Sequence, residues 1–163
     1  MENMPRLRPM TAVYLMRPGQ ILLLYRQGSR IADRLWVGSA GGHMEPGEIR
    51  DPRECVLREL REELGLMPDD LSGLQMRYVN IRRAKGEIRQ NYYFFAELKS
   101  DVPLSSGEGI LQWFDFDEIS KLDMPFSARH MLMHYVSTGI QTDKLYVGVA
   151  DGEKVVFTEL PDF

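Results

Sequence analysis

The chain has 163 residues, of which 44% are hydrophobic and 27% are charged, a composition typical of an ordinary folded domain. Its formal net charge of −4 argues against binding nucleic acid or an anionic membrane through bulk electrostatics. The single cysteine, Cys55, rules out an internal disulfide framework and predicts a reducing, cytoplasmic setting. The first ten residues lack an apolar signal-peptide core, and no apolar run approaches about 18 residues, so neither a signal peptide nor a membrane span is predicted.

The beginning of the chain predicts a β-hairpin. Residues 10–16 and 20–26 are rich in Val, Leu and Tyr, and Gly19 lies in the turn between them. A polar loop follows and leads to a short predicted strand at residues 35–37. No repeat, low-complexity tract or dividing linker appears anywhere, so residues 1–163 are predicted to form a single domain.

Three arginines lie near this loop, just before an acidic segment. Arg26, Arg30 and Arg34 could hold the oxygens of a polyphosphate through their guanidinium groups. The alternative is that each is a solvated loop side chain. Arg26 and Arg34 are therefore candidate substrate-binding residues.

The acidic segment predicts a helix with an unusual stripe of carboxylates. Asp51 and Pro52 form a good helix start, and Gly65 a good stop after Leu64. Four apolar side chains share one predicted face: Val56, Leu57, Leu60 and Leu64. Beside them is a stripe formed by Glu59, Glu62 and Glu63. Carboxylates at this spacing repel one another. Arg58 and Arg61 point away from the stripe, although Arg58 could reach Glu62.

Taken alone, this helix could be an ordinary solvated amphipathic helix. The segment before it favours a metal site instead. Gly41 and Gly42 predict a turn with close backbone approach, and residues 45–48 form a tight acidic turn that ends in Glu48. Carboxylate oxygens and a free carbonyl are the ligands that Mg²⁺ and Mn²⁺ prefer.

These residues together resemble the Nudix box, the signature of the Nudix hydrolases. Gly42 and Glu48 have the spacing of its first half, and residues 58–66, RELREELGL, match its end at every specified position. The matching residues are Gly42, Glu48, Arg58, Glu59, Glu62, Glu63 and Gly65. The chain departs from the pattern between Glu48 and Arg58, where it has two additional residues. We place them before Pro52, because an insertion inside the helix would rotate the stripe by about 200°.

Beyond the box, residues 74–83 and 87–98 predict a second, longer hairpin. The loop at residues 99–109 contains Glu108, five residues before Trp113. In several Nudix enzymes that act on nucleoside triphosphates, a Glu at this spacing approaches the metals, which makes Glu108 a candidate. A plain loop glutamate is the alternative.

The C-terminal part predicts a strand at residues 110–114, a helix at 127–137 and a terminal hairpin turning at Asp151-Gly152. Met124 and Phe126 lie where related purine-triphosphate enzymes contact the base, so both are candidate substrate-binding residues. His130 and His134 have the i, i+4 spacing of a metal pair, but no third ligand is in view. Surface or half-buried histidines are the preferred interpretation.

The order of strands and helices predicts an α/β domain, and the resemblance implies the Nudix α/β/α sandwich with a mixed β-sheet between helices. It also implies a Mg²⁺- or Mn²⁺-dependent pyrophosphohydrolase. Glu59 and Glu63, with a carbonyl of Gly41 or Gly42, would hold the metal, Glu62 would be a further ligand or the general base, and Glu108 is an alternative base. Arg58 would position the glutamates.

The substrate predicted from the resemblance is a nucleoside triphosphate, such as the oxidised 8-oxo-dGTP, cleaved to the monophosphate and pyrophosphate by a MutT-like enzyme. The alternatives are another nucleoside diphosphate derivative, such as ADP-ribose or a dinucleoside polyphosphate, and a non-catalytic nucleotide-binding Nudix module. The predicted partner is a small nucleotide, with neither nucleic acid nor membrane. The chain would be a monomer or a homodimer.

Overall fold

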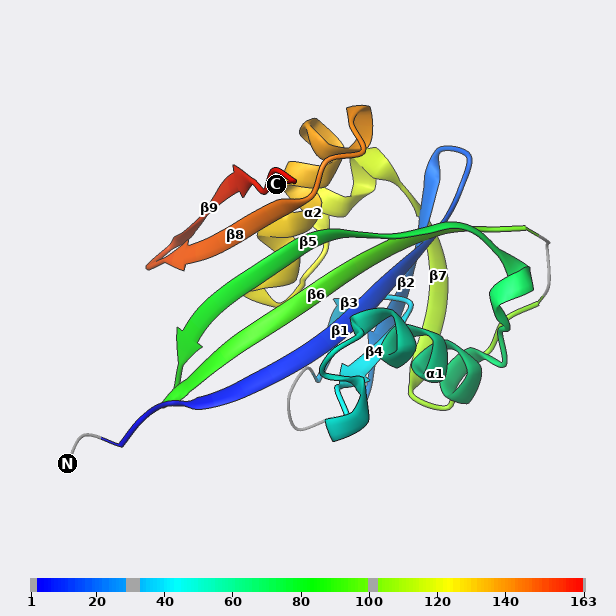
Figure 1. Ribbon diagram of the computed structural model, residues 1–163. Coiled ribbons are helices and arrows are strands. Elements are labelled where there is room, and N and C mark those ends of the chain that lie inside the picture. Colours follow the sequence, from blue (N-terminus) through cyan, green and yellow to red (C-terminus); the bar gives the residue numbers. More distant parts are fainter. Residues whose placement is uncertain (1–2, 29–32, 100–102, 163) are drawn as a thin grey trace.

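The computed structural model describes residues 3–28, 33–99 and 103–162, and within these ranges nine strands form one sheet (Figure 1). The strands are β1 (Arg6–Arg17), β2 (Gln20–Arg26), β3 (Leu35–Val37), β4 (Ala40–His43), β5 (Leu71–Ala84), β6 (Glu87–Leu98), β7 (Gly109–Asp115), β8 (Tyr146–Asp151) and β9 (Lys154–Glu159). The helices are α1 (Pro52–Leu64) and α2 (Phe126–Ser137), with short 3-10 helices η1 (Pro46–Glu48), η2 (Pro68–Asp70), η3 (Phe116–Lys121) and η4 (Gly139–Gln141). None of the helices in the described ranges is both long and apolar enough to cross a membrane.

The sheet is mixed, as predicted. Its strands follow the order β3-β2-β1-β6-β5-β8-β9, while β4 pairs with β1 and β7 pairs with β2. β1 runs parallel to β6 and β5 runs parallel to β8, whereas the hairpin partners are antiparallel. β1 is the organising strand, because it pairs with β6 along one edge and with β4 and then β2 along the other.

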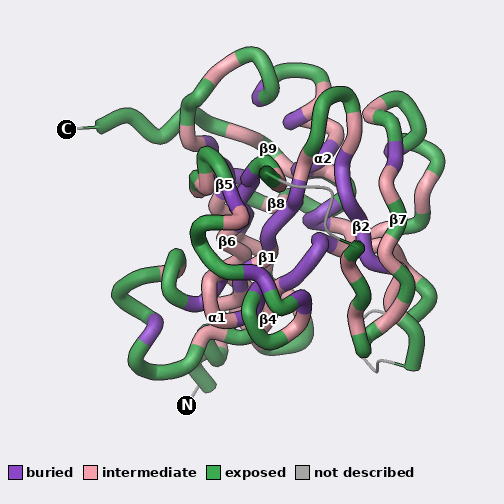
Figure 2. The backbone as a smooth tube through the Cα atoms, turned by 90° about the vertical axis from the view of Figure 1, so that its right-hand side faces the viewer, coloured by how far each residue is buried: buried purple, intermediate pink, exposed green. Residues whose placement is uncertain are grey.

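Two apolar cores lie on opposite faces of this sheet, and each includes one helix. Neighbouring residues of β1 point to opposite faces, as the pleat of a strand requires. Tyr14 packs with Met131 and Leu132 of α2, whereas Val13 packs with Val56 and Leu60 of α1. Figure 1 shows the two helices on either side of the long strands, and Figure 2 shows buried residues along the central strands. The predicted α/β/α sandwich is confirmed.

Two turn predictions were wrong. Gly41 and Gly42 do not form a turn but lie in β4, where they pair with Ala12 and Thr11 of β1. A short segment with two glycines lacks the alternating pattern of a strand, so its pairing with β1 could not be predicted from the neighbouring residues. In the terminal hairpin Asp151 pairs with Lys154, so the turn is Gly152-Glu153 and not Asp151-Gly152.

Three predicted strands are longer in the structure. β1 begins at Arg6 instead of residue 10, because its N-terminal residues pair in parallel with β6, which is distant in sequence. β5 begins at Leu71 and runs to Ala84, beyond the predicted residues 74–83. β7 runs from Gly109 to Asp115 instead of the predicted residues 110–114, and it pairs along the whole of β2.

Candidate active site

The carboxylate stripe lies on α1, and the boundaries of this helix agree with the local sequence signals. The Asp51 side chain accepts a hydrogen bond from the Arg53 N–H at the N-terminus, and Gly65 ends the helix with a left-handed φ of 68°. The helix is uninterrupted from Pro52 to Leu64. The additional residues of the box therefore lie before Pro52, as predicted, and the stripe keeps its geometry.

Arg58 is the centre of a charged network at the start of this site. Its guanidinium donates hydrogen bonds to both carboxylate oxygens of Glu48, at 2.7 and 2.9 Å, and to the carbonyl of His43 at 3.2 Å. It also forms ion pairs with Glu62 at 3.1 Å and with Glu59 at 3.0 Å. The expectation that Arg58 points away from the stripe was wrong, because its long side chain folds back along the helix surface. The predicted contact with Glu62 is confirmed.

The Glu48–Arg58 pair is held out of water. The side chains of Glu48 and Arg58 are only 10% and 16% exposed. The hydrogen bonds from Arg58 lower the pKa of the Glu48 carboxyl to about 2, so this carboxylate is ionised at neutral pH. The two additional residues of the loop thus leave Glu48 within reach of the helix, where it fixes Arg58 beside Glu59.

The two glycines of β4 allow the carboxylates of α1 to approach the strand. The Gly41 N–H donates a hydrogen bond to Glu63 at 3.3 Å. A Cβ atom on Gly42 would lie 2.6 Å from the Glu59 Oε1 atom, which is closer than such atoms approach in proteins. Any side chain at position 42 would therefore displace Glu59. The glycines act through close strand–helix contact, not through a turn.

Glu63 lies where several negative charges converge. Burial, followed by the charges of Glu108 and Glu59, raises the pKa of the Glu63 carboxyl to about 8. Glu108, which directly precedes β7, forms an ion pair with Arg26 of β2 at 2.9 Å. The sequence placed these glutamates on distant segments, and the sheet brings them to one location.

These oxygen donors fit a hard divalent cation in charge and in chemistry. A cation between Glu59, Glu63 and Glu108 would relieve their mutual repulsion. Within the described ranges, no group of three His, Cys, Asp or Glu side chains is drawn together into a complete metal cage. Glu59 and Glu108 each pair with an arginine, so a metal would have to take these carboxylates from Arg58 and Arg26.

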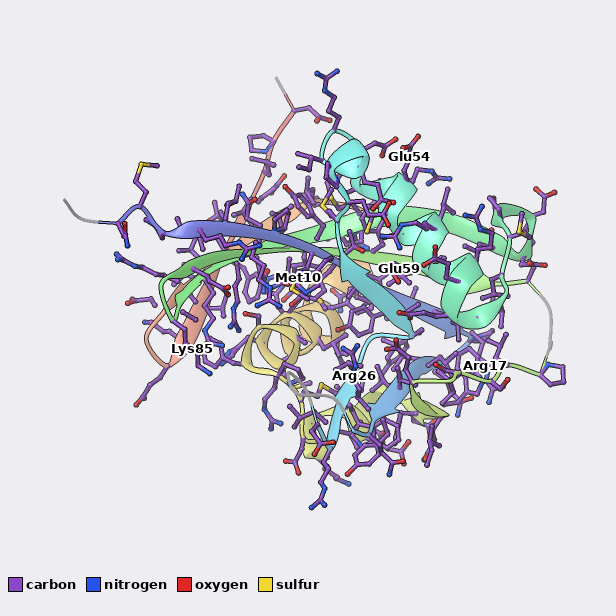
Figure 3. The ribbon with its side chains drawn as sticks, turned by 90° about the horizontal axis from the view of Figure 1, so that it is seen from below. Met10, Arg17, Arg26, Glu54, Glu59 and Lys85 are labelled. Carbon is purple, nitrogen blue, oxygen red and sulfur yellow. The ribbon has the colours of Figure 1, made fainter. Side chains whose placement is uncertain are left out.

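A cavity of about 190 Å³ opens beside these carboxylates. Glu63, Glu108 and Arg26 line one end, close to Gly41 and Gly42. From there the cavity extends over β1 and β6 towards the start of α2. Its remaining lining includes Tyr93, Asn91, Arg89, Arg82, Phe126 and Ser127. In Figure 3 the labelled Glu59 and Arg26 lie to one side of Met10, and Lys85 lies to the other.

The cavity includes some of the predicted substrate-binding residues and not others. Arg26 and Phe126 line it. Arg34 does not, because its side chain is 83% exposed and lies 3.9 Å from Asp33. Met124 packs against the core on the α2 face instead of lining the cavity. Arg30 lies outside the described residues.

Other predicted residues also have defined positions. Glu62 is 54% exposed and does not line the cavity. His130 and His134 are both half-buried, as expected, and the Tyr78 hydroxyl lies 2.7 Å from the His134 Nδ1 atom. Cys55 is fully buried beside Thr11, and burial raises the pKa of its thiol to about 11. A buried thiol with a raised pKa is unsuited to act as a nucleophile.

Among the polar residues of the cavity that the sequence did not single out as site residues are Arg82, Arg89 and Asn91. A signal for two of them was present. Arg89, Asn91 and Tyr93 alternate along β6 and therefore point to one face of the sheet. The register of the hairpin was ambiguous from sequence, however, so the face they share could not be assigned.

Comparisons with known proteins identify relatives of this chain. A family model described as NUDIX domain matches residues 6–135. The chain is 33% identical over 139 residues to the NAD-capped RNA hydrolase NudC of Chromobacterium violaceum, a match that covers 84% of this chain and 49% of that protein. The chain therefore spans about half the length of this curated relative.

Solved structures share the fold. The MutT protein from Bacillus halodurans has a TM-score of 0.64 and 23% identity, over 95% of this chain and 99% of that one. The E. coli ORF135 protein has a TM-score of 0.66 and 22% identity, over 84% and 94% of the two chains. A C. elegans Ap4A hydrolase has a TM-score of 0.64 and 18% identity, over 84% and 99%. At these identities the likeness concerns the fold alone.

Proposed function

The chain belongs to the Nudix hydrolase family, and from this premise we propose that it is a metal-dependent pyrophosphohydrolase that cleaves a phosphoanhydride bond of a nucleotide. The observation that carries the proposal is that Glu63 and Glu108 line a cavity large enough to hold part of a nucleotide, with Glu59 next to Glu63. A phosphoanhydride carries several negative oxygens, so its hydrolysis needs positive charge in the site and a well-oriented water.

Glu59 and Glu63 are the proposed ligands of Mg²⁺ or Mn²⁺, together with the carbonyl of Gly42, and Glu62 is proposed as either a further ligand or the general base. When bound, the metal supplies neutralisation of the phosphate oxygens and acidifies water at the site. Glu62 or Glu108 accepts the proton of the attacking water. Arg58 contacts no substrate in this scheme. It positions Glu59 and Glu62, and Glu48 in turn holds Arg58 in place.

The proposed substrate is a nucleoside triphosphate, such as 8-oxo-dGTP, cleaved to the monophosphate and pyrophosphate. Phe126 is a proposed contact of the nucleobase, because it lines the cavity at the end away from Glu63, and one face of its ring is covered by the Arg82 guanidinium. Arg26 lies beside Glu108 at the acidic end, where its guanidinium could bind a phosphate oxygen. The structures with the same fold include both a MutT protein and an Ap4A hydrolase, and a dinucleoside polyphosphate is the alternative substrate.

The carboxylate assignment is tested by Glu63→Gln and Glu59→Gln. Each change removes a carboxylate oxygen that would hold the metal while nearly preserving shape, so Mg²⁺-dependent turnover should fall by at least about a hundredfold, with an unchanged circular dichroism spectrum. Glu54→Gln is a matched control on the same helix, because Glu54 is exposed in the first turn, and it should retain activity. Full activity in purified Glu63→Gln would contradict the assignment.

The substrate is tested by incubating the protein and Mg²⁺ with dGTP, 8-oxo-dGTP, ADP-ribose and a dinucleoside tetraphosphate, and measuring the released products. Pyrophosphate release that is fastest from 8-oxo-dGTP would support the proposal, and a chelator should abolish it. If ADP-ribose or the dinucleoside tetraphosphate were cleaved faster, that compound would take the place of 8-oxo-dGTP as the proposed substrate. Tight nucleotide binding without turnover of any compound would instead identify a non-catalytic module.

A further inference from the structure

Three arginines lie side by side across the sheet at the end of the cavity away from the carboxylates. Arg8 of β1 is paired in register with Arg89 of β6, and Arg89 is paired with Arg82 of β5. We call these three residues the arginine row. Like charges directly opposite each other on neighbouring strands destabilise a sheet. Such a row therefore favours a negatively charged partner.

The protein itself supplies only part of that negative charge. One carboxylate, Glu87, contacts both Arg8 at 3.2 Å and Arg89 at 3.4 Å. Arg82 forms no ion pair with any of the described residues, and its guanidinium instead lies over the Phe126 ring, 4.6 Å from the ring centre. The row and Glu87 together therefore carry a formal excess of two positive charges.

The excess charge faces the cavity. Arg82 and Arg89 both line it, next to Asn91. The start of α2 lies at the same end, where Ser127 and Ala128 line the cavity and no side chain caps the helix. The free N–H groups and the positive end of the helix dipole add to the attraction for an anion. Arg82 also stacks on Phe126 at this end of the cavity.

The sheet register gives the distance between the two charged ends. Glu63 accepts a hydrogen bond from Gly41, which pairs with Ala12 of β1. Arg8 lies four residues before Ala12 on the same strand, which corresponds to a separation of about 13 Å between the two backbone positions. Glu63 at one end and Arg82 and Arg89 at the other all line the same cavity, so one nucleoside could bridge the two ends. Figure 3 shows this direction along the sheet, from Glu59 past Met10 towards Lys85.

We propose that Arg82 and Arg89, with the start of α2, bind a second phosphate group of the substrate, on the far side of the nucleoside from the hydrolysed anhydride. This rests on the proposed function, because it assigns the polyphosphate to the carboxylate end. A nucleotide that carries phosphate on both sides of its nucleoside should then bind more tightly than the same nucleotide without the second phosphate. A neutral base edge would leave the excess charge of the row uncompensated, whereas a phosphate neutralises it and accepts hydrogen bonds from both guanidinium groups.

The proposal is tested by binding, measured calorimetrically in EDTA so that neither metal nor turnover is needed. The probes are guanosine 5′-monophosphate, guanosine 3′,5′-bisphosphate and the 5′-phosphorylated dinucleotide pGpG. The second phosphate should tighten binding about tenfold or more, as expected for hydrogen bonds between charged groups. A gain with the bisphosphate identifies a terminal phosphate as the ligand, and a gain with pGpG alone identifies a phosphodiester.

The double variant Arg82→Gln/Arg89→Gln should lose this gain and bind all three probes with affinities within about threefold. Arg83→Gln is the matched control, because Arg83 is the exposed neighbour of Arg82 and does not line the cavity, and it should keep the gain. Equal weakening of all three probes in the double variant, or no gain in the wild type, would overturn the proposal.

This result is separable from the proposed function. Glu63→Gln should keep the full binding gain for the second phosphate even when it has lost turnover. If no nucleotide is hydrolysed but the gain is present and depends on the two arginines, the phosphate site stands and the hydrolase assignment fails. If nucleotides are hydrolysed but the second phosphate gives no gain in binding, the hydrolase assignment stands and the phosphate site fails.

Discussion

Gly42 shows how strictly a single residue can control this site. The Glu59 carboxylate fills the space where a Cβ atom would lie, so Gly42→Ala should push Glu59 away from its position beside Arg58. A displacement of about 1 Å in such a site can cost about a hundredfold in rate, and a decrease of this order in kcat/KM is expected. Gly47→Ala is the control, because a Cβ atom there would meet no atom within 4 Å. Equal activity of the two variants would contradict the close approach.

Glu48 should make the free energy of unfolding depend on pH in the acidic range. The folded-state pKa of about 2 lies below the ordinary value of 4.5. Ionised Glu48 therefore stabilises the folded protein above about pH 5, and this contribution is lost as the pH falls from about 4.5 towards 2. Glu48→Gln should lower the free energy of unfolding at pH 7 by about 1–3 kcal/mol. Between about pH 4.5 and 2, the free energy of unfolding of this variant should depend less on pH than that of the wild type.

The measurement is urea unfolding at several pH values between 7 and 3. Glu45→Gln is the matched control, because Glu45 belongs to the same turn but is 65% exposed and lies 3.8 Å from Arg58. An exposed pair of this kind contributes little, so this variant should follow the wild type. If the free energies of Glu48→Gln and of the wild type fell in parallel with acid, Glu48 would not be the titrating group.

At the scale of the element, α1 joins the site to the core. Its buried face is formed by Val56, Leu60 and Leu64, which pack under β1. Leu60→Ala should lower the free energy of unfolding by about 2–5 kcal/mol, because it leaves a cavity in a closed core. Arg61→Ala, at an exposed neighbouring position, should change it by less than about 0.5 kcal/mol. Chemical denaturation measures both, and similar losses would contradict this packing.

The elements also show what the sequence can and cannot predict. The limits of α1 were correct because its start and stop signals, Asp51, Pro52 and Gly65, act through neighbouring residues. β4 was missed because two glycines give no alternating pattern, and its partner is β1, about thirty residues earlier. The early start of β1 depends on β6, which is still further away. Local signals therefore predicted elements, and pairing between distant segments extended them.

The site divides in the same way. The stripe on α1 could be predicted because i, i+3 and i+4 spacing fixes side chains on one face of a helix. Glu108 could be proposed only from a family resemblance, because its proximity to Glu63 depends on β7 pairing with β2. The contribution of Arg82 and Arg89 depends on the register between β5 and β6. This register includes irregularities near Ser72 and Met76 that the sequence does not reveal.

At the scale of the whole molecule, the sheet separates two cores but should still unfold as one domain. β1 supplies Val13 to the α1 core and Tyr14 to the α2 core. Disrupting either core therefore disturbs the strand on which the other depends. This coupling supports the proposal that the chain is a single cooperative domain, which should unfold in one transition.

The two tryptophans can test this coupling, because each reports on a different core. Trp36 packs against the α2 core and Trp113 against the α1 core. Trp36→Phe and Trp113→Phe each leave one fluorescent reporter. In each variant, urea unfolding followed by fluorescence should coincide with unfolding followed by circular dichroism, with the same midpoint and the same slope. If the fluorescence of one reporter changed at a lower urea concentration than the circular dichroism of the same variant, that core would unfold separately. The single-domain proposal would then fail.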